Sequence, residues 1–267
     1  MRIRLEHEQT GQSVPVNSAS HTLLQRTLCT EPTGEQGRPY EGLDHPTTDP
    51  RMLRCRTHRH HGIVPQGTNP DWTEYYKWSS FREPRPMLLA ACERLGAGVG
   101  RVAVDLGCGE GTDALALLDR GWSVVAVDAD PAGLALLRAR IPARCAEQIQ
   151  VIRADFADAR FPRAHLIHAG FSLPFCAPRQ FPVLRTRIHR ALLPGGILAA
   201  QLFGTRDSWA GNPDMTFHDQ EEVRAFLDGL EILALHETER DGKAFSGPKH
   251  WHTYDILARK PDENDSQ

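Results

Sequence analysis

The residues best suited to hold a charged ligand lie in one stretch of this 267-residue chain, VAVDLGCGEGTDALALL at 102–118. An apolar run there breaks into closely spaced glycines and restarts with helical spacing. Such a turn presents backbone N–H groups to a ligand. Asp105 comes just before the glycines and Glu110 stands among them. Two carboxylates beside the turn favour a ligand that carries positive charge.

The spacing of the glycines distinguishes among nucleotide-like ligands. Gly107, Gly109 and Gly111 form G-x-G-x-G, whereas the dinucleotide fingerprint is G-x-G-x-x-G. Thr112 occupies the position of that third glycine, and no Gly-Lys-Ser/Thr of a phosphate-binding loop follows. The carboxylates would repel a pyrophosphate but attract a sulfonium and an α-ammonium group. The turn therefore predicts S-adenosylmethionine as the cofactor.

Two further acids stand at the ends of the next two apolar runs. Asp128 is placed to bond the ribose hydroxyls of the cofactor. Its alternative role is a helix cap, which Asp130 fills better. Asp155, followed by Phe156, is placed to accept from the adenine amino group while the ring flanks the base. The alternative for Asp155 is a turn residue at the end of a loop.

Apolar runs and helical periods alternate along the chain, which predicts the elements that position these residues. Strands are expected at 101–106, 122–128, 148–155, 164–170, 197–203, 231–240 and 250–260. Helices are expected at 87–95, from Thr112 or Asp113 to Gly121, after Asp130, around 180–193 and after Asp219. Strands that are apolar on both faces indicate a parallel sheet covered by helices on both sides. The short polar loop DGKAFSGPK predicts that the last two strands pair antiparallel. The expected fold is α/β and doubly wound, with a mostly parallel seven-stranded sheet and a reversed last strand.

From residue 72 to 260 the chain resembles the class I S-adenosylmethionine-dependent methyltransferases. The segments that carry the resemblance are VDLGCGEGTDALAL, VVAVDAD, IRADF and LLPGGILAAQLFG. The whole is similar to small-molecule methyltransferases of the tellurite-resistance and thiopurine type. One departure is His165, where the fourth strand of the family often begins with Asp. The expected cofactor-binding residues are Asp105, Gly107, Cys108, Gly109, Gly111, Asp113, Asp128, Ala129, Asp155, Phe156 and Gly170.

Aromatic and basic residues are expected around the transferred methyl group. Ligands of an open α/β sheet bind at the carboxyl ends of its parallel strands, and a reversed strand begins at that edge. A lid is expected from residues 72–78. The expected substrate residues are Trp72, Tyr76, Phe175, Trp209, Lys249 and Trp251, with Tyr75 and His218 nearby. His250 and His252 are candidate catalytic bases, or alternatively core histidines. No metal is expected, since no third ligand accompanies this pair.

Composition narrows the class of protein. The net charge is −3 and the pI about 6.5, which disfavours nucleic-acid and membrane partners. Six scattered cysteines without a C-x-x-C pair are typical of reduced thiols in the cytoplasm. Residues 1–70 are expected to be a poorly ordered extension, 71–260 the methyltransferase domain and 261–267 a tail.

The expected function is methyl transfer to a small molecule. Two alternatives stay open: a nucleic-acid methyltransferase that uses the basic stretch RMLRCRTHRHH at 51–61, and a catalytically silent S-adenosylmethionine-binding protein. The alternative interpretation of the basic stretch is a solvated tail that contacts no ligand. The acceptor and the oligomeric state are not determined by the sequence.

Overall fold

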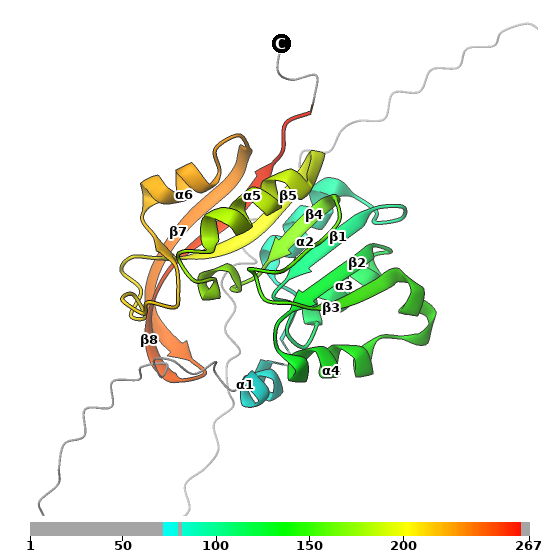
Figure 1. Cartoon of the computed structure of the whole chain (residues 1–267), viewed down its shortest axis with the longest axis horizontal. Coiled ribbons are helices and arrows are strands. Elements are labelled where there is room, and N and C mark those ends of the chain that lie inside the picture. Colours follow the sequence, from blue (N-terminus) through cyan, green and yellow to red (C-terminus); the bar gives the residue numbers. More distant parts are fainter. Residues whose placement is uncertain (1–71, 80–81, 263–267) are drawn as a thin grey trace, which may run out of the picture. The chain divides into compact units, whose positions relative to one another are not determined.

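A single sheet of eight strands forms the centre of the described part of the chain, which comprises residues 72–79 and 82–262 of a computed structural model (Figure 1). The predicted extension, with its basic stretch, and residues 263–267 lie outside this part. The strands are β1 (Val102–Leu106), β2 (Ser123–Asp128), β3 (Ile149–Arg153), β4 (Ala164–Ala169), β5 (Leu192–Gly204), β6 (Phe217–His218), β7 (Glu231–Ala244) and β8 (Gly247–Arg259).

The order of the strands is β3-β2-β1-β4-β5-β8-β7, and β6 pairs separately with β5. Neighbours from β3 to β5 are parallel, whereas β8 is antiparallel to both β5 and β7. The predicted fold class and the reversed last strand are therefore confirmed. The sequence did not predict β6, because two residues carry no detectable alternation.

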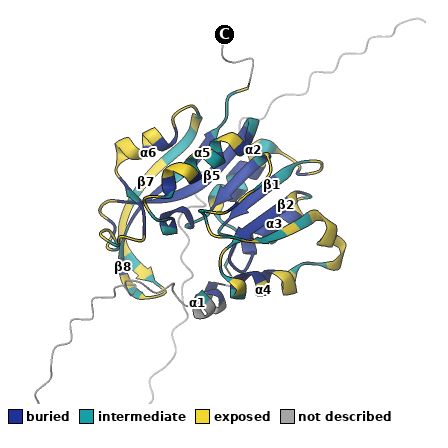
Figure 2. Cartoon of the chain, in the orientation of Figure 1, coloured by how far each residue is buried: buried dark blue, intermediate teal, exposed yellow. Residues whose placement is uncertain are grey.

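Helices cover both faces of the sheet. The α-helices are α1 (Trp72–Ser79), α2 (Pro86–Leu95), α3 (Thr112–Asp119), α4 (Pro131–Arg140), α5 (Phe181–Ala191) and α6 (Gln220–Phe226), and two 3₁₀ turns are η1 (Ala143–Gln148) and η2 (Leu173–Phe175). One buried cluster joins α2, α3 and α4 to one face of the sheet, and a second joins α5 and α6 to the other. The central strands are accordingly buried along almost their whole length (Figure 2).

Local capping signals explain where two of the helices, α4 and α6, begin. Asp130 accepts a hydrogen bond from the N–H of Ala132, and Pro131 takes the first helical position of α4. Asp219 forms a reciprocal capping box with Glu222 at the start of α6. The start of α3 differs from the prediction, because neither Thr112 nor Asp113 caps it. Its N-cap is Gly111, in the left-handed region with φ 87°.

The strands β7 and β8 continue beyond the rest of the sheet as a two-stranded ribbon. Pairing of β8 with β5 ends at Thr253 with Phe203, whereas pairing with β7 runs on to Gly247 with Ala244. Since β8 begins at the edge where the parallel strands end, the ribbon extends past their carboxyl ends. This ribbon and α1 both line the cavity described next.

Candidate active site

A cavity of about 1340 Å³ lies at the carboxyl ends of the parallel strands. Its walls come from the segments after β1 to β5, from α1 and from the β7–β8 ribbon. Pockets that hold one drug-sized ligand occupy roughly 300–1000 Å³. The volume therefore suits two ligands side by side, as a group-transfer reaction requires.

The glycine turn after β1 forms one end of this cavity. Gly107, Gly109 and Gly111 all have positive φ, between 53° and 87°, which disfavours any side chain. A Cβ at Gly107 would lie 2.2 Å from Ser172, and one at Gly111 would lie 2.2 Å from Leu137. Gly107 and Gly109 line the cavity. Gly111 does not line it, and its role is to let α4 approach the turn.

Asp128 connects the end of β2 to the glycine turn. Its two carboxylate oxygens accept hydrogen bonds of 2.8 Å from the backbone N–H groups of Gly109 and Asp130. Burial raises the pKa of Asp128 above its usual value, although these two hydrogen bonds oppose the shift. Each oxygen keeps a second lone pair, and the residue faces the cavity. Asp128 is thus fixed as a hydrogen-bond acceptor.

Asp105 lies behind the turn rather than in the cavity. It pairs in register with His168 on β4, and its Oδ1 lies 2.9 Å from His168 Nδ1. Both side chains are buried, and Oδ2 of Asp105 has no hydrogen-bond partner in the described part of the chain. The structure therefore does not bring this predicted cofactor residue to the cavity surface.

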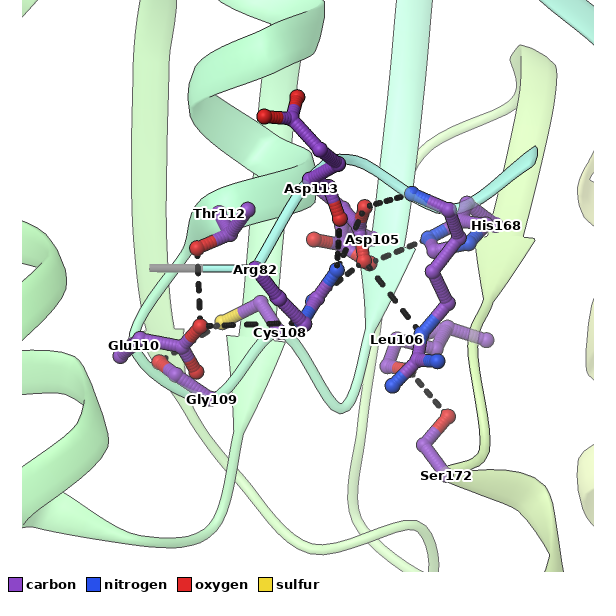
Figure 3. Close-up of polar contacts among 12 residues, drawn as sticks. Arg82, Asp105, Leu106, Cys108, Gly109, Glu110, Thr112, Asp113, His168 and Ser172 are labelled. Carbon is purple, nitrogen blue, oxygen red and sulfur yellow. Dashed lines mark hydrogen bonds and ion pairs between the residues drawn. The ribbon is translucent and has the colours of Figure 1, made fainter. Parts of the chain in front are cut away.

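Two arginines that the sequence analysis missed lie beside the turn. Arg82 donates to both carboxylate oxygens of Asp113, at 3.2 and 2.7 Å, and its Nε lies 4.0 Å from Glu110 (Figure 3). The backbone N–H of Arg85 donates to Asp113 at 2.9 Å. Asp113 therefore ties the segment after α1 to the start of α3. Burial would raise its pKa, but His168 and Arg82 outweigh this and lower it.

The side chain of Arg85 lines the cavity, and its Nε has no hydrogen-bond partner in the described part of the chain. Its guanidinium lies 4.5 Å from the centre of the Phe171 ring. Its Nε is buried and makes no hydrogen bond, although an Asp113 oxygen lies 3.7 Å away. Burial lowers the pKa of Arg85, and Arg82 adds to this effect. This N–H is a buried donor that a ligand oxygen in the cavity could satisfy.

Tyr76, which was predicted to contact substrate, lies against the glycine turn. A Cβ at Gly109 would lie 3.0 Å from its ring, and one at Gly133 would lie 2.9 Å from it. Burial raises the pKa of the buried Tyr76 hydroxyl, and Asp128 and Asp130 raise it further. The tyrosine therefore covers the turn from the side of α1.

Aromatic rings form the other end of the cavity. The centre of the Trp72 ring lies 5.1 Å from that of Phe175, which lies 6.4 Å from Trp209. Trp251 lies 6.1 Å from Trp209 and 6.0 Å from Phe171. Phe171 has a left-handed backbone with φ 54°, unusual for a bulky residue, and this conformation belongs to the turn after β4. All five rings line the cavity.

The three basic residues near the start of β8 do not line the cavity. Lys249 is buried, pairs with Asp207, and lies 3.7 Å from the centre of the Trp209 ring. His250 and His252 lie on the face of β8 opposite Trp251. His252 Nε2 lies 2.8 Å from a Glu237 oxygen. The sequence correctly placed the start of β8 at the carboxyl ends of the parallel strands. It could not determine which face of β8 lines the cavity.

Most of the other predicted residues do line the cavity. From the cofactor set these are Gly107, Cys108, Gly109, Asp113, Asp128, Ala129, Asp155, Phe156 and Gly170, and from the substrate set Trp72, Tyr76, Phe175, Trp209 and Trp251. Tyr75 also lines it, whereas His218 is buried against Phe181 at 4.6 Å between ring centres. Within residues 72–79 and 82–262, no cluster of His, Cys, Asp and Glu could hold a metal ion, and no helix could cross a membrane.

Comparison with known proteins identifies the family. A family model described as a methyltransferase domain matches residues 103–196, which run from β1 into β5. This chain carries a methyltransferase domain. The predicted family is thereby confirmed, and S-adenosylmethionine is supported as its cofactor.

Curated relatives of this chain match part of its length. It is 32% identical over 164 residues to a carboxy-S-adenosyl-L-methionine synthase of Pectobacterium atrosepticum, covering 55% of this chain and 66% of the relative. It is 36% identical over 138 residues to a trans-aconitate 2-methyltransferase of Acidovorax ebreus, covering 49% of this chain and 50% of the relative. The chain thus spans between half and two thirds of these proteins.

Solved structures share the fold at low sequence identity. TehB from Haemophilus influenzae has a TM-score of 0.57 and 17% identity, covering 70% of this chain and 65% of that one. A 1,6-didemethyltoxoflavin-N1-methyltransferase of Burkholderia thailandensis, solved with S-adenosylhomocysteine, has a TM-score of 0.53 and 20% identity, covering 71% and 83%. At this identity the likeness supports the fold alone.

Proposed function

We propose that the protein is a methyltransferase that transfers the methyl group of S-adenosylmethionine to a small molecule. The observation that carries the proposal is the left-handed glycine turn with Asp128 bonded to its backbone, at one end of a two-ligand cavity in a methyltransferase domain. The names of two relatives, which act on trans-aconitate and 1,6-didemethyltoxoflavin, support a small acceptor.

The residues at the turn fit the parts of S-adenosylmethionine. Asp128 would accept from the ribose hydroxyls, and Asp155 with Phe156 would hold the adenine. The unpartnered Nε of Arg85 would donate to the α-carboxylate, while Glu110 and Asp113 face the α-ammonium group. Donors and acceptors thus match a zwitterionic amino acid joined to a nucleoside.

For methyl transfer, the protein must mainly position the acceptor and exclude water from the site. S-adenosylmethionine supplies a methyl group already activated by a positive sulfur. The aromatic end would exclude water and hold the acceptor in line with that sulfur. Histidine is missing from the residues that line the described cavity, so the proposal assigns no proton transfer to His250 or His252.

We also propose that the protein works in the cytoplasm. The four cysteines of the described part, Cys92, Cys108, Cys145 and Cys176, are buried free thiols. Free thiols persist in a reducing compartment.

Calorimetry on the full chain tests the cofactor. S-adenosylmethionine and S-adenosylhomocysteine should bind, and NAD and ATP should not. Asp128→Ala should weaken S-adenosylhomocysteine binding by about 1.5–3 kcal/mol, because a ribose acceptor is lost. Asp119→Ala, at an exposed carboxylate, is the control. NAD affinity equal to that of S-adenosylhomocysteine would overturn the assignment.

Turnover is tested by S-adenosylhomocysteine release across a panel of small acceptors. Release that depends on one acceptor supports the enzyme. Binding without release on any acceptor would favour the silent binding protein, and salt-sensitive retention on nucleic acid would favour a nucleic-acid methyltransferase.

A further inference from the structure

We infer that the acceptor of this methyltransferase is a planar aromatic molecule with an anionic group. The inference rests on the proposed function and specifies the substrate class of the same cavity. Two independent features at the acceptor end carry it: a wall of aromatic rings, and two cations of the β7–β8 ribbon that form no ion pair within the described part of the chain.

The aromatic wall is continuous and comes from five separate segments. Phe203 contacts two rings of this wall, because its ring centre lies 5.9 Å from those of both Trp209 and Trp251. Five of these ring pairs meet edge to face, at angles between 62° and 88°. Three others are tilted, at angles between 51° and 59°. Rings in such an arrangement present both faces and edges to an inserted planar ligand.

One of the two cations, Arg240, lies on the inner face of the ribbon. Arg240 pairs in register with Trp251, so the two side chains share a face. Its Nη1 lies 3.0 Å from the position of a Cβ at Gly242, and the Trp251 indole lies 3.4 Å from the same point. The missing side chain of Gly242 thus leaves room for the guanidinium beside the indole. Lys243 alternates with Asp241 and so belongs to the other face, but it stands next to the turn of the ribbon and also lines the cavity.

The acids of the ribbon face the other way. Glu237 and Glu239 each bind Arg206 at 2.8 Å, and Asp241 lies 2.7 Å from His250. These partners lie on the outer face, because pairing places Asp241 opposite His250 and Arg240 opposite Trp251. Neither Arg240 nor Lys243 makes an ion pair with a described residue. The ribbon therefore presents Arg240 inward and adds Lys243 to the cavity lining near its turn.

The two ends of the cavity differ in charge. Four carboxylates, Glu110, Asp113, Asp128 and Asp155, line the donor end together with two cations, Arg82 and Arg85, and Arg82 is paired with Asp113. The acceptor end has one carboxylate, Asp214, against the two cations of the ribbon. A guanidinium binds planar carboxylates and phosphates through paired N–H groups. An anionic ring would hence stack on the aromatic wall with its charge toward Arg240.

Calorimetry with simple ring compounds tests this substrate class on the full chain saturated with S-adenosylhomocysteine. The compounds are 2-naphthoate, 2-naphthyl phosphate, 2-naphthamide and cyclohexanecarboxylate. At least one naphthyl anion should bind about tenfold more tightly than the amide and the aliphatic acid. The two anionic arms distinguish a carboxylate from a phosphate.

Variants separate the two features. Arg240→Gln with Lys243→Gln should remove the tenfold preference for the anion and leave 2-naphthamide binding unchanged. Trp251→Leu should weaken every naphthyl compound. Arg163→Gln is the matched control, because it removes an exposed arginine just before β4, at the amino ends of the parallel strands and away from the cavity.

The possible failures are distinguishable. If S-adenosylhomocysteine does not bind, the proposed function itself fails. If it binds but no naphthyl compound does, or the amide binds as tightly as the anions, the substrate class is wrong. A preference for the anion that survives the double variant also overturns the role of the ribbon.

Discussion

Lys249 and Asp207 form an ion pair that solvent does not reach, with side-chain exposures of 1% and 0%. The carboxylate of Asp207 also accepts from the backbone N–H groups of Trp209 and His252, at 2.9 and 3.2 Å. The ammonium of Lys249 lies 3.7 and 4.7 Å from the ring centres of Trp209 and Trp251. The pair therefore joins the loop after β5 to the start of β8 directly behind the aromatic wall.

Breaking this pair from one side should be costly. Lys249→Met leaves a buried carboxylate, and Asp207→Asn leaves a buried ammonium whose pKa burial already lowers. Each single variant should lose about 3–5 kcal/mol of unfolding free energy, measured in urea. The double variant should lose less than the sum of the two, because no charge is left unpaired. Strictly additive losses would show that the two side chains do not interact.

Two glycine variants separate the stability cost of a side-chain clash from the cost of a strained backbone. Gly111→Ala forces an alanine to φ 87° and places its Cβ 2.2 Å from Leu137. Gly229→Ala is the control, because its φ is 81° and nothing lies within 4 Å of its Cβ. The control should lose about 1–2 kcal/mol of stability, and Gly111→Ala about 1–3 kcal/mol more. Equal losses on chemical denaturation would mean that Leu137 moves aside without cost.

Much of this architecture could be predicted because its signals are local. Apolar runs show β1 to β5, and Asp130 followed by Pro131 indicates the start of α4. The glycine turn and Asp128 were found because the turn follows β1 and Asp128 ends β2, two strands that are buried on both faces. Such signals can be recognised in the sequence because apolar periodicity and helix capping involve residues that are near one another in the chain.

The features that the sequence missed depend on contacts between distant segments. Arg82 and Arg85 belong to no motif, and Asp113, 28 residues beyond Arg85, brings both to the turn instead of capping α3. Lys249 was expected at the methyl group, since nothing in PKHWH reveals that Asp207 holds it inside. The inner face of β8 could not be chosen, because both faces begin with polar and aromatic residues.

Acid should weaken the attachment of the segment after α1. The pKa of Asp113 is lowered in the folded protein, so its contribution is present above the ordinary carboxyl pKa of about 4 and is lost as pH falls through the lowered value. The difference in melting temperature between the wild-type protein and Asp113→Asn should therefore shrink between pH 6 and pH 3. Asp119→Asn, which breaks an exposed pair with Arg144, should show little difference throughout. A constant difference for Asp113→Asn would contradict the lowered pKa.

His250, on the outer face of the ribbon, should stabilise the protein only at low and neutral pH. This half-buried side chain lies 3.0 Å from Glu239 and 2.7 Å from Asp241, and hydrogen bonds to both acids raise its pKa. Its contribution to stability is therefore present below the ordinary histidine pKa of about 6.5 and is lost as pH rises through the raised value. His250→Gln should lower the melting temperature slightly at pH 6 and have no effect at pH 9.

Turnover should respond differently from stability. Because His250 lies on the face of β8 opposite Trp251, His250→Gln should change kcat by less than about twofold with an acceptor that gives turnover. Trp251→Leu, one position along on the cavity face, should raise KM for that acceptor. A loss of about 10²–10⁴ in kcat for His250→Gln, shrinking as pH rises past the acceptor's own pKa, would instead identify a general base. That result would require the β7–β8 ribbon to rotate in the complex, so that His250 and His252 face the reacting atoms.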